Sequence, residues 1–246
     1  MWTAISNIDL RDLDDRTKSD YLECWASLLD SVGRILLQHD DSDIERLRFS
    51  FKMPIPIIYS SKIVVLASNL VYLNCISDFS INLLVATRSL ANAYVDVYNY
   101  EEVEEEVSRR NIRSLTGNQS VGSLTISDDT LEDVPVFQNL IHLKVVREMS
   151  SHRIGILLVL MQRISNLRFL EIAEEFTRDT EIILQDDRNF EIITCCLRSH
   201  LKACSIKAIY GQEAPILLLK HFLKHSAVIQ RVVVHYPNNA SDYMGK

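Results

Sequence analysis

The sequence predicts an α/β fold: a solenoid of short parallel strands with helical or irregular connections. Two observations predict it. A short apolar pattern recurs along the chain, and several segments between its copies place apolar residues at helical spacing. The chain has 246 residues, of which 47% are hydrophobic, with only 6 glycines and 5 prolines. It is therefore long enough for a sizeable core, and its composition excludes disordered and collagen-like chains.

The recurring pattern is apolar-x-x-apolar-x-apolar, and we count eight copies. They begin at Ile44, Leu70, Leu90, Val121, Leu140, Leu167, Leu201 and Ile229. Successive copies start 19 to 34 residues apart, which is close to the roughly 20–29 residues of leucine-rich repeats with some longer insertions. We expect the fourth and sixth positions to point inward from a short strand and the first to anchor the chain before it. One strand cannot bury these side chains alone, so neighbouring copies must stack.

Three segments are predicted to be helical. Residues 20–38 precede the first copy and predict an N-terminal helical lid, and residues 154–164 predict a second helix. Residues 214–227 predict a third helix, with a proline near its start and cations toward its end. The predicted apolar face of this last helix consists of Ile216, Leu219, Leu223 and Ala227.

The third and fifth positions of each copy should point out of the sheet. Ten of these residues form the predicted protein-binding face: Arg46, Arg48, Tyr72, Asn74, Asn92, Tyr94, His142, Lys144, Phe169 and Glu171. The other outward positions are Ser123, Thr125, Ala203, Ser205, Arg231 and Val233. Aromatic anchors among polar groups carry much of the energy of protein interfaces. The alternative is that these aromatic residues only shield the sheet.

Groups that could carry chemistry are present, but they form no known constellation. His221 and His225 are four residues apart, yet the glutamate of the zinc-protease helix is missing, and we expect both on the exposed flank of the last helix. A second set comprises Cys195, Cys196, His200 and Cys204. It contains no Cys-x-x-Cys pair, so we expect buried structural thiols. With no nucleophile elbow or phosphate loop either, the sequence predicts no enzyme, catalytic residue, metal site or cofactor.

Charge and targeting signals point to the inside of the cell. The net charge is −7, which argues against a general nucleic-acid partner, although the part from residue 197 onward has 7 basic residues against 2 acidic ones and could mark a partner surface. The N-terminus lacks a secretory signal, and the longest apolar run, at 154–161, is far shorter than the roughly 20 residues that cross a membrane. We expect an intracellular protein of the cytoplasm or nucleus, with no membrane partner.

Five segments resemble the plant F-box/leucine-rich-repeat/FBD family. Residues 2–10 resemble the tail of an F-box, and residues 28–51 resemble the link into the first repeat. Residues 134–143 and 165–172 resemble the repeats of that family, and residues 200–234 resemble the FBD motif that ends many members. The order of these segments covers nearly the whole chain and implies an RNI-like leucine-rich-repeat solenoid.

The resemblance also implies a division into parts. We expect an F-box remnant and helical lid at 1–40, leucine-rich repeats at 41–190 and FBD-like C-terminal repeats at 191–246. In intact members the F-box grips a Skp-type adaptor, and here most of it would precede Trp2, so the adaptor is a partner only if the F-box is restored.

The expected function is a non-enzymatic protein-binding module that resembles the substrate-recognition part of F-box proteins, with a target protein that the sequence does not identify. Two alternatives stay open. One is a complete substrate receptor of a cullin-based ubiquitin ligase whose F-box lies outside this gene model. The other is a degenerate member without function, because the small Ala93 at an inward position leaves packing incomplete.

Overall fold

The computed structural model divides into two compact units, Met1–Gly122 and Ser123–Lys246, called unit 1 and unit 2 below. The residues that the structure describes are 7–11, 44–51, 61–65, 69–77, 81–85, 89–97, 120–127, 131, 134–146, 151–173, 195–207 and 213–235. The predicted helical lid at 20–38 lies outside the described residues.

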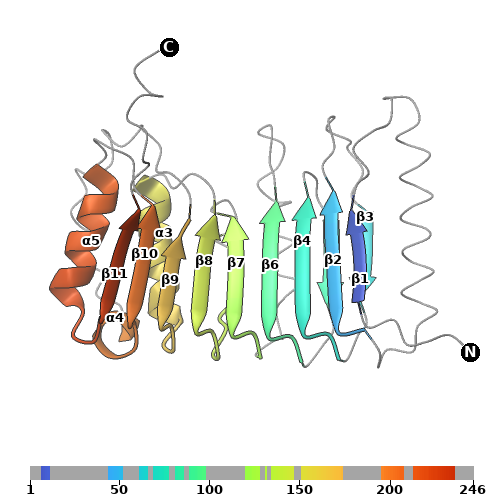
Figure 1. Ribbon diagram of the computed structural model, residues 1–246, viewed down its shortest axis with the longest axis horizontal. Coiled ribbons are helices and arrows are strands. Elements are labelled where there is room, and N and C mark those ends of the chain that lie inside the picture. The colour runs from blue at the N-terminus through green and yellow to red at the C-terminus, as the bar shows by residue number, and fades with distance from the viewer. Residues whose placement is uncertain are drawn as a thin grey trace, which may run out of the picture. The chain divides into compact units, whose positions relative to one another are not determined.

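Unit 1 contains parallel strands (Figure 1). They are β1 (Asn7–Arg11), β2 (Arg46–Phe51), β3 (Ser61–Val65), β4 (Tyr72–Ser77), β5 (Ile81–Val85) and β6 (Asn92–Val97). The first sheet has the order β1-β2-β4-β6, while β3 and β5 pair with each other separately. Each strand of the first sheet thus lies next to the strand of the neighbouring copy of the pattern.

Unit 2 combines parallel strands with helices. Its strands are β7 (Ser123–Ser127), β8 (His142–Val146), β9 (Phe169–Ile172), β10 (Ala203–Lys207) and β11 (Arg231–His235), in that spatial order. Its helices are α3 (Ser151–Arg163), α4 (Cys195–Ser199) and α5 (Glu213–His225). Figure 1 shows α3 behind these strands, and none of the described helices crosses the face toward the viewer. The α/β class and the parallel strands are therefore confirmed, and both are compatible with a leucine-rich-repeat fold.

Every copy of the apolar pattern forms a strand that begins at its third position. The copies also pair position by position, so that Leu47 lies opposite Leu73 and Leu143 lies opposite Leu170. This register follows from the pleat, because a slip by one residue would turn every apolar side chain of a strand to the other face. Repetition of the pattern therefore fixes which side chains share a face.

The core is built from the first, fourth and sixth positions. Leu70, Leu73, Leu140 and Leu143 are completely buried. Even the small Ala93 is buried, at 4% exposure, opposite Leu73. In the copy at β11, by contrast, Val232 and Val234 are only half-buried, and among the described strands β11 pairs only with β10.

Helices α3 and α4 complete the core of unit 2. On α3, buried residues at i, i+3, i+4 and i+7 form one continuous apolar stripe: Ile154, Leu157, Leu158 and Met161. The short helix α4 contacts both α3 and α5, and the Cys196 thiol donates a hydrogen bond of 3.4 Å to the Met161 carbonyl oxygen. The helix predicted at 154–164 is confirmed, with a start three residues earlier.

The third predicted helix also exists, but its buried face differs from the prediction. In α5 the predicted face is open to solvent, with Ile216 47% and Leu223 59% exposed. The buried residues are Pro215, Leu218 and Phe222 instead, which are also separated by three and four positions. The helix carries two apolar stripes, so periodicity alone did not determine which one packs inward.

Two further expectations about burial are wrong. His221 was expected on an exposed flank, yet it is 5% exposed, because it follows the buried stripe of α5. Cys195 was expected to be a buried thiol, yet it is exposed at the first residue of α4, while its neighbour Cys196 is buried. On a helix, adjacent residues lie about 100° apart, so one of two neighbouring cysteines can face water.

The adjacent residues Phe222 and Leu223 test the assignment of the α5 face. We expect Phe222→Ala to lower the free energy of unfolding by about 3–5 kcal/mol, because it empties a completely buried site. Leu223→Ala should cost less than about 1 kcal/mol, because 59% of that residue is already exposed. Urea denaturation followed by circular dichroism measures both, and equal losses, or a larger loss at Leu223, would contradict the assignment.

Two inward positions are cysteines, and burial sets their acidity. Desolvation raises the pKa of the Cys75 thiol from 9.0 to about 12, with a smaller contribution from the Asp96 charge, and burial alone raises the pKa of Cys204 to about 12. Both thiols therefore stay protonated in the folded chain at neutral pH, and a protonated thiol is a poor nucleophile.

We expect iodoacetamide at pH 8 to label exposed Cys195 quickly and to leave Cys75 and Cys204 unlabelled until the chain is unfolded in urea. The pKa values of these two thiols are higher in the folded chain than in the unfolded chain. The free energy of unfolding therefore keeps its full contribution from the protonated thiols below pH 9 and loses it as the pH rises toward about 12. Peptide mass spectrometry reads the labelling, and fast modification of Cys75 in the native chain would contradict its burial.

Candidate functional site

The candidate site is the face of each sheet that is formed by the third and fifth positions of the pattern. Because the copies pair in register, these side chains form two rows across the strands. In unit 1 the rows are Asn7, Arg46, Tyr72 and Asn92, and Asp9, Arg48, Asn74 and Tyr94. In unit 2 they are Ser123, His142, Phe169, Ala203 and Arg231, and Thr125, Lys144, Glu171, Ser205 and Val233. We call these rows the outward face of each unit.

The structure thus assigns each predicted residue to one of these two faces. Arg46, Arg48, Tyr72, Asn74, Asn92 and Tyr94 lie together on unit 1, and His142, Lys144, Phe169 and Glu171 lie together on unit 2. Most are exposed or half-buried, but Asn74 is only 7% exposed, because bulkier side chains flank it in its row.

Tyr72 is the best-fixed aromatic residue on the outward face of unit 1. The guanidinium carbon of Arg46 lies 5.2 Å from the centre of its ring, a cation–π arrangement. The amide nitrogen of Asn74 donates a hydrogen bond of 3.3 Å to the Tyr72 hydroxyl. Contacts on two sides hold the ring in one orientation, and a preorganised side chain loses little entropy when a partner binds.

The same face holds two buried polar atoms that lack a hydrogen bond. They are Oδ1 of Asn74 and Nε of Arg48, which belong to paired positions of neighbouring strands. A buried polar group without a partner costs on the order of 1–3 kcal/mol. A water molecule or a polar group of a partner would recover part of that cost, which favours polar contacts at this point.

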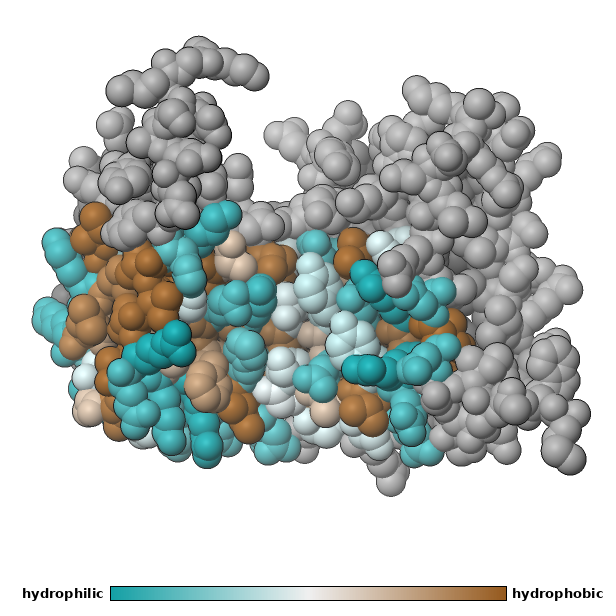
Figure 2. Space-filling view, in the orientation of Figure 1, coloured by the Kyte–Doolittle hydropathy of each residue, from teal (hydrophilic) through white to brown (hydrophobic). Residues whose placement is uncertain are grey.

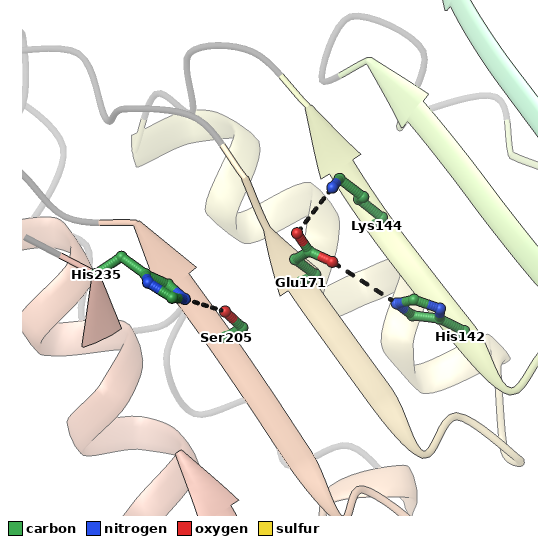
Figure 3. Close-up of polar contacts among 5 residues, drawn as sticks. All are labelled: His142, Lys144, Glu171, Ser205 and His235. Carbon is green, nitrogen blue, oxygen red and sulfur yellow. Dashed lines mark hydrogen bonds and ion pairs between the residues drawn. The ribbon is translucent and has the colours of Figure 1, made fainter. Parts of the chain in front are cut away.

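An ion pair links two strands of unit 2. The Lys144 ammonium donates a hydrogen bond of 2.8 Å to Oε1 of Glu171, and His142 Nε2 lies 4.0 Å from Oε2 of the same carboxylate (Figure 3). The His142 contact becomes an ion pair only when the imidazole is protonated. The charge of Lys144 is therefore largely matched within the face itself.

Phe169 lies beside this ion pair and is the most open aromatic residue of the predicted set. It is 44% exposed, and its ring meets the His142 ring edge-on, with the ring centres 6.2 Å apart. The next residue in its row is the small Ala203, which leaves one side of the ring uncovered. One strand further, Ser205 Oγ and His235 Nε2 lie 3.1 Å apart (Figure 3).

Sequence analysis missed the contribution of β1. Residues 5–10 carry the same pattern, with Ile5, Ile8 and Leu10 at its apolar positions, and β1 begins at the third position, Asn7. Ile8 is 8% exposed, so it packs inward as a fourth position should. This ninth copy was hidden because the segment was assigned to the tail of an F-box, and it adds Asn7 and Asp9 to the outward face of unit 1.

A third row was also missed, formed by the second position of each copy, just before the strand. In unit 2 it runs Ile141, Arg168, Lys202 and Gln230, and we call it the rim row. Backbone hydrogen bonds of 2.8 Å join Arg168 N to the Ile141 carbonyl, Lys202 N to that of Arg168 and Gln230 N to that of Lys202. All four residues are exposed. These residues could have been predicted from the sequence, because each of them directly follows the first apolar position of its copy.

The described residues do not assemble a site for metal chemistry. His221 and His225 lie with their ring centres 4.7 Å apart, but no group of three or more His, Cys, Asp or Glu side chains gathers in the described ranges. Zinc sites need three or four protein ligands. What the described part of the chain offers is a polar and aromatic surface on two parallel sheets.

Among the described helices, none is both long and apolar enough to span a bilayer.

The fold and the outward faces are those of an α/β protein with open parallel sheets, a class compatible with leucine-rich-repeat proteins. Two plant proteins are similar in sequence. An FBD-associated F-box protein of Arabidopsis thaliana is 28% identical over 190 residues, which are 71% of this chain and 40% of that protein. An F-box/FBD/LRR-repeat protein of the same plant is 32% identical over 146 residues, 55% of this chain and 32% of that protein.

The chain is thus related to these two plant F-box/FBD proteins, and this similarity supports the resemblance predicted from its motifs. The chain spans less than half the length of either relative. No family profile matches the chain. No solved structure matches it either.

The strength of the Lys144–Glu171 pair can be measured by a double-mutant cycle with Lys144→Ala, Glu171→Ala and the double variant. About a third of each side chain is exposed, so we expect a coupling free energy of about 0.2–1 kcal/mol at low ionic strength. The coupling should shrink in 1 M salt, where the screening length is roughly 3 Å. Urea denaturation measures it, and a coupling above about 2 kcal/mol would contradict a solvent-screened pair.

Proposed function

We propose that the chain is a leucine-rich-repeat solenoid that binds a protein partner through its outward faces and performs no chemistry. The observation that carries this proposal is the outward face itself: rows of aromatic, amide and charged side chains lie in register on parallel strands, and in unit 2 none of the described helices covers them. The relatives, one named as an FBD-associated F-box protein and the other as an F-box/FBD/LRR-repeat protein, support a role in protein interaction.

The residues on these faces are suited to protein recognition. Tyrosine, phenylalanine and arginine are enriched at interface hot spots, and each outward face presents such a group, with Arg46 and Tyr72 in unit 1 and Phe169 and Arg231 in unit 2. The strands fix the backbone that carries these side chains, so the conformational entropy lost on binding comes mainly from ordering the side chains. We place this interaction inside the cell, in the cytoplasm or nucleus.

A second candidate is a substrate receptor of a cullin-based ubiquitin ligase. The observation that favours it is that both relatives are named F-box proteins and are more than twice as long as the part matched here. In this case the outward faces would bind the substrate, and an F-box would bind a Skp-type adaptor. A pull-down of the chain against such an adaptor, alongside a form extended upstream by an F-box, separates the two candidates.

The proposal predicts that outward-face substitutions remove a specific partner. Tagged chain is expressed in plant cells as the natural sequence, as Tyr72→Ala/Tyr94→Ala in unit 1 and as His142→Ala/Phe169→Ala in unit 2. We expect quantitative mass spectrometry to find a partner whose recovery falls by about tenfold or more in one of these variants, because hot-spot truncation costs at least about 1–2 kcal/mol.

The matched control is Val159→Ala/Gln162→Ala, which changes two exposed positions of α3 away from the outward face. This variant should recover the partner as well as the natural sequence does. Circular dichroism establishes that all variants fold. Partner recovery that depends on the α3 positions, or that no outward-face substitution changes, would refute the proposal.

A further inference from the structure

A cationic surface surrounds the exposed aromatic residue of unit 2. Arg168 and Lys202 are neighbours in the rim row, directly before β9 and β10, and Arg231 begins β11 in the same row as Phe169. All three cations are exposed, as is Phe169, at 44%. In Figure 2 hydrophilic residues gather over the end of the unit 2 sheet where these strands begin. We call these four residues the cationic corner.

Among the described residues, the charges of the cationic corner have no ion-pair partner. Within the described ranges, none of Arg168, Lys202 and Arg231 forms an ion pair, whereas the nearby Lys144 is neutralised by Glu171 at 2.8 Å. The chain as a whole carries a net charge of −7. A local concentration of unpaired positive charge on an acidic protein attracts negatively charged partners and speeds their association.

The spacing of these residues suits an extended peptide. Neighbouring strands are about 4.8 Å apart, so the step from Phe169 past Ala203 to Arg231 covers roughly 10 Å, the length of about three residues of extended chain. An apolar side chain can cover the open side of the Phe169 ring above Ala203. Carboxylates before and after it then reach Arg168, Lys202 and Arg231, and arginine binds carboxylates in a bidentate manner.

We propose that the cationic corner binds an acidic peptide segment of a partner protein, with an apolar side chain seated on Phe169 between acidic residues. This inference rests on the proposed function and narrows the class of partner. The corner has a single aromatic residue, and the carboxylate of Glu171 is two residues further along the same strand, so it is poorly suited to stacking bases or to binding a run of phosphates.

Fluorescence anisotropy on the full chain tests the proposal. The probe is a short fluorescein-labelled peptide of Asp and Glu around a central Leu, compared with analogues that carry a central Ser or basic residues in place of the acidic ones. We expect the acidic Leu peptide to bind, the Ser analogue to bind several-fold more weakly and the basic analogue not to bind. Affinity should fall as salt is raised, because the charges are exposed.

Two double variants with the same change in charge test whether peptide binding depends on the cationic corner or only on the overall charge of the protein. Arg168→Glu/Lys202→Glu should lower the affinity at least about tenfold, while Lys220→Glu/Lys224→Glu, at exposed positions of α5, should leave it within about twofold. Phe169→Ala should remove the preference for Leu over Ser. Circular dichroism on each variant checks that the fold is kept.

Three results would overturn the inference. The first is an equal loss of affinity in the two charge-reversal variants, and the second is equal binding of the acidic and basic peptides. The third is a single-stranded RNA oligonucleotide that binds at least as tightly as the acidic peptide and depends equally on Arg168 and Lys202. The last would assign the corner to nucleic acid. If the peptide fails while outward-face substitutions still remove a cellular partner, only this inference falls. If those substitutions also have no effect, the proposed function falls with it.

Discussion

Both units depend on the burial of the first, fourth and sixth side chains of one short pattern between neighbouring strands. A single copy exposes more apolar surface than it covers, so each strand is stable only because the next copy pairs with it in the same register. Leu73, for example, is completely buried between its counterparts Leu47 and Ala93. The outward faces and the rim row of unit 2 follow from this constraint, because in-register inward residues force the residues between them into rows.

The copy at β11 shows how the burial of inward side chains depends on neighbouring strands. Among the described strands β11 pairs only with β10, and its inward valines are only half-buried, although their sequence fits the pattern as well as any other copy. Helix α5 precedes this strand and leaves Ile216 and Leu223 largely exposed. In a repeat protein each copy is stabilised by its neighbours, so a copy that pairs with a single described strand leaves more of its apolar surface exposed than a copy between two strands.

The sequence alone predicted the elements that local repetition determines. A strand formed at each of the eight recognised copies, and α3 formed where apolar residues had helical spacing. It did not predict which of two apolar stripes of α5 would be buried, because that choice depends on what α4 presents to it, and α4 comes from another part of the chain. Nor did it predict the burial of Asn74, which results from neighbours on two other strands.

For the candidate site too, the sequence predicted what local repetition determines and not what depends on contacts between distant segments. Its membership could be predicted, because the third and fifth positions of a strand must face away from the core, but its electrostatics could not. Whether Lys144 offers a free charge depends on Glu171, 27 residues later, and only the register of β8 and β9 brings the two together. Within the described ranges, that pairing neutralises the cation at the centre of the outward face, whereas Arg168, Lys202 and Arg231, at the start of the strands around Phe169, form no ion pair. There the proposed acidic ligand gains both a charge contact and an apolar contact.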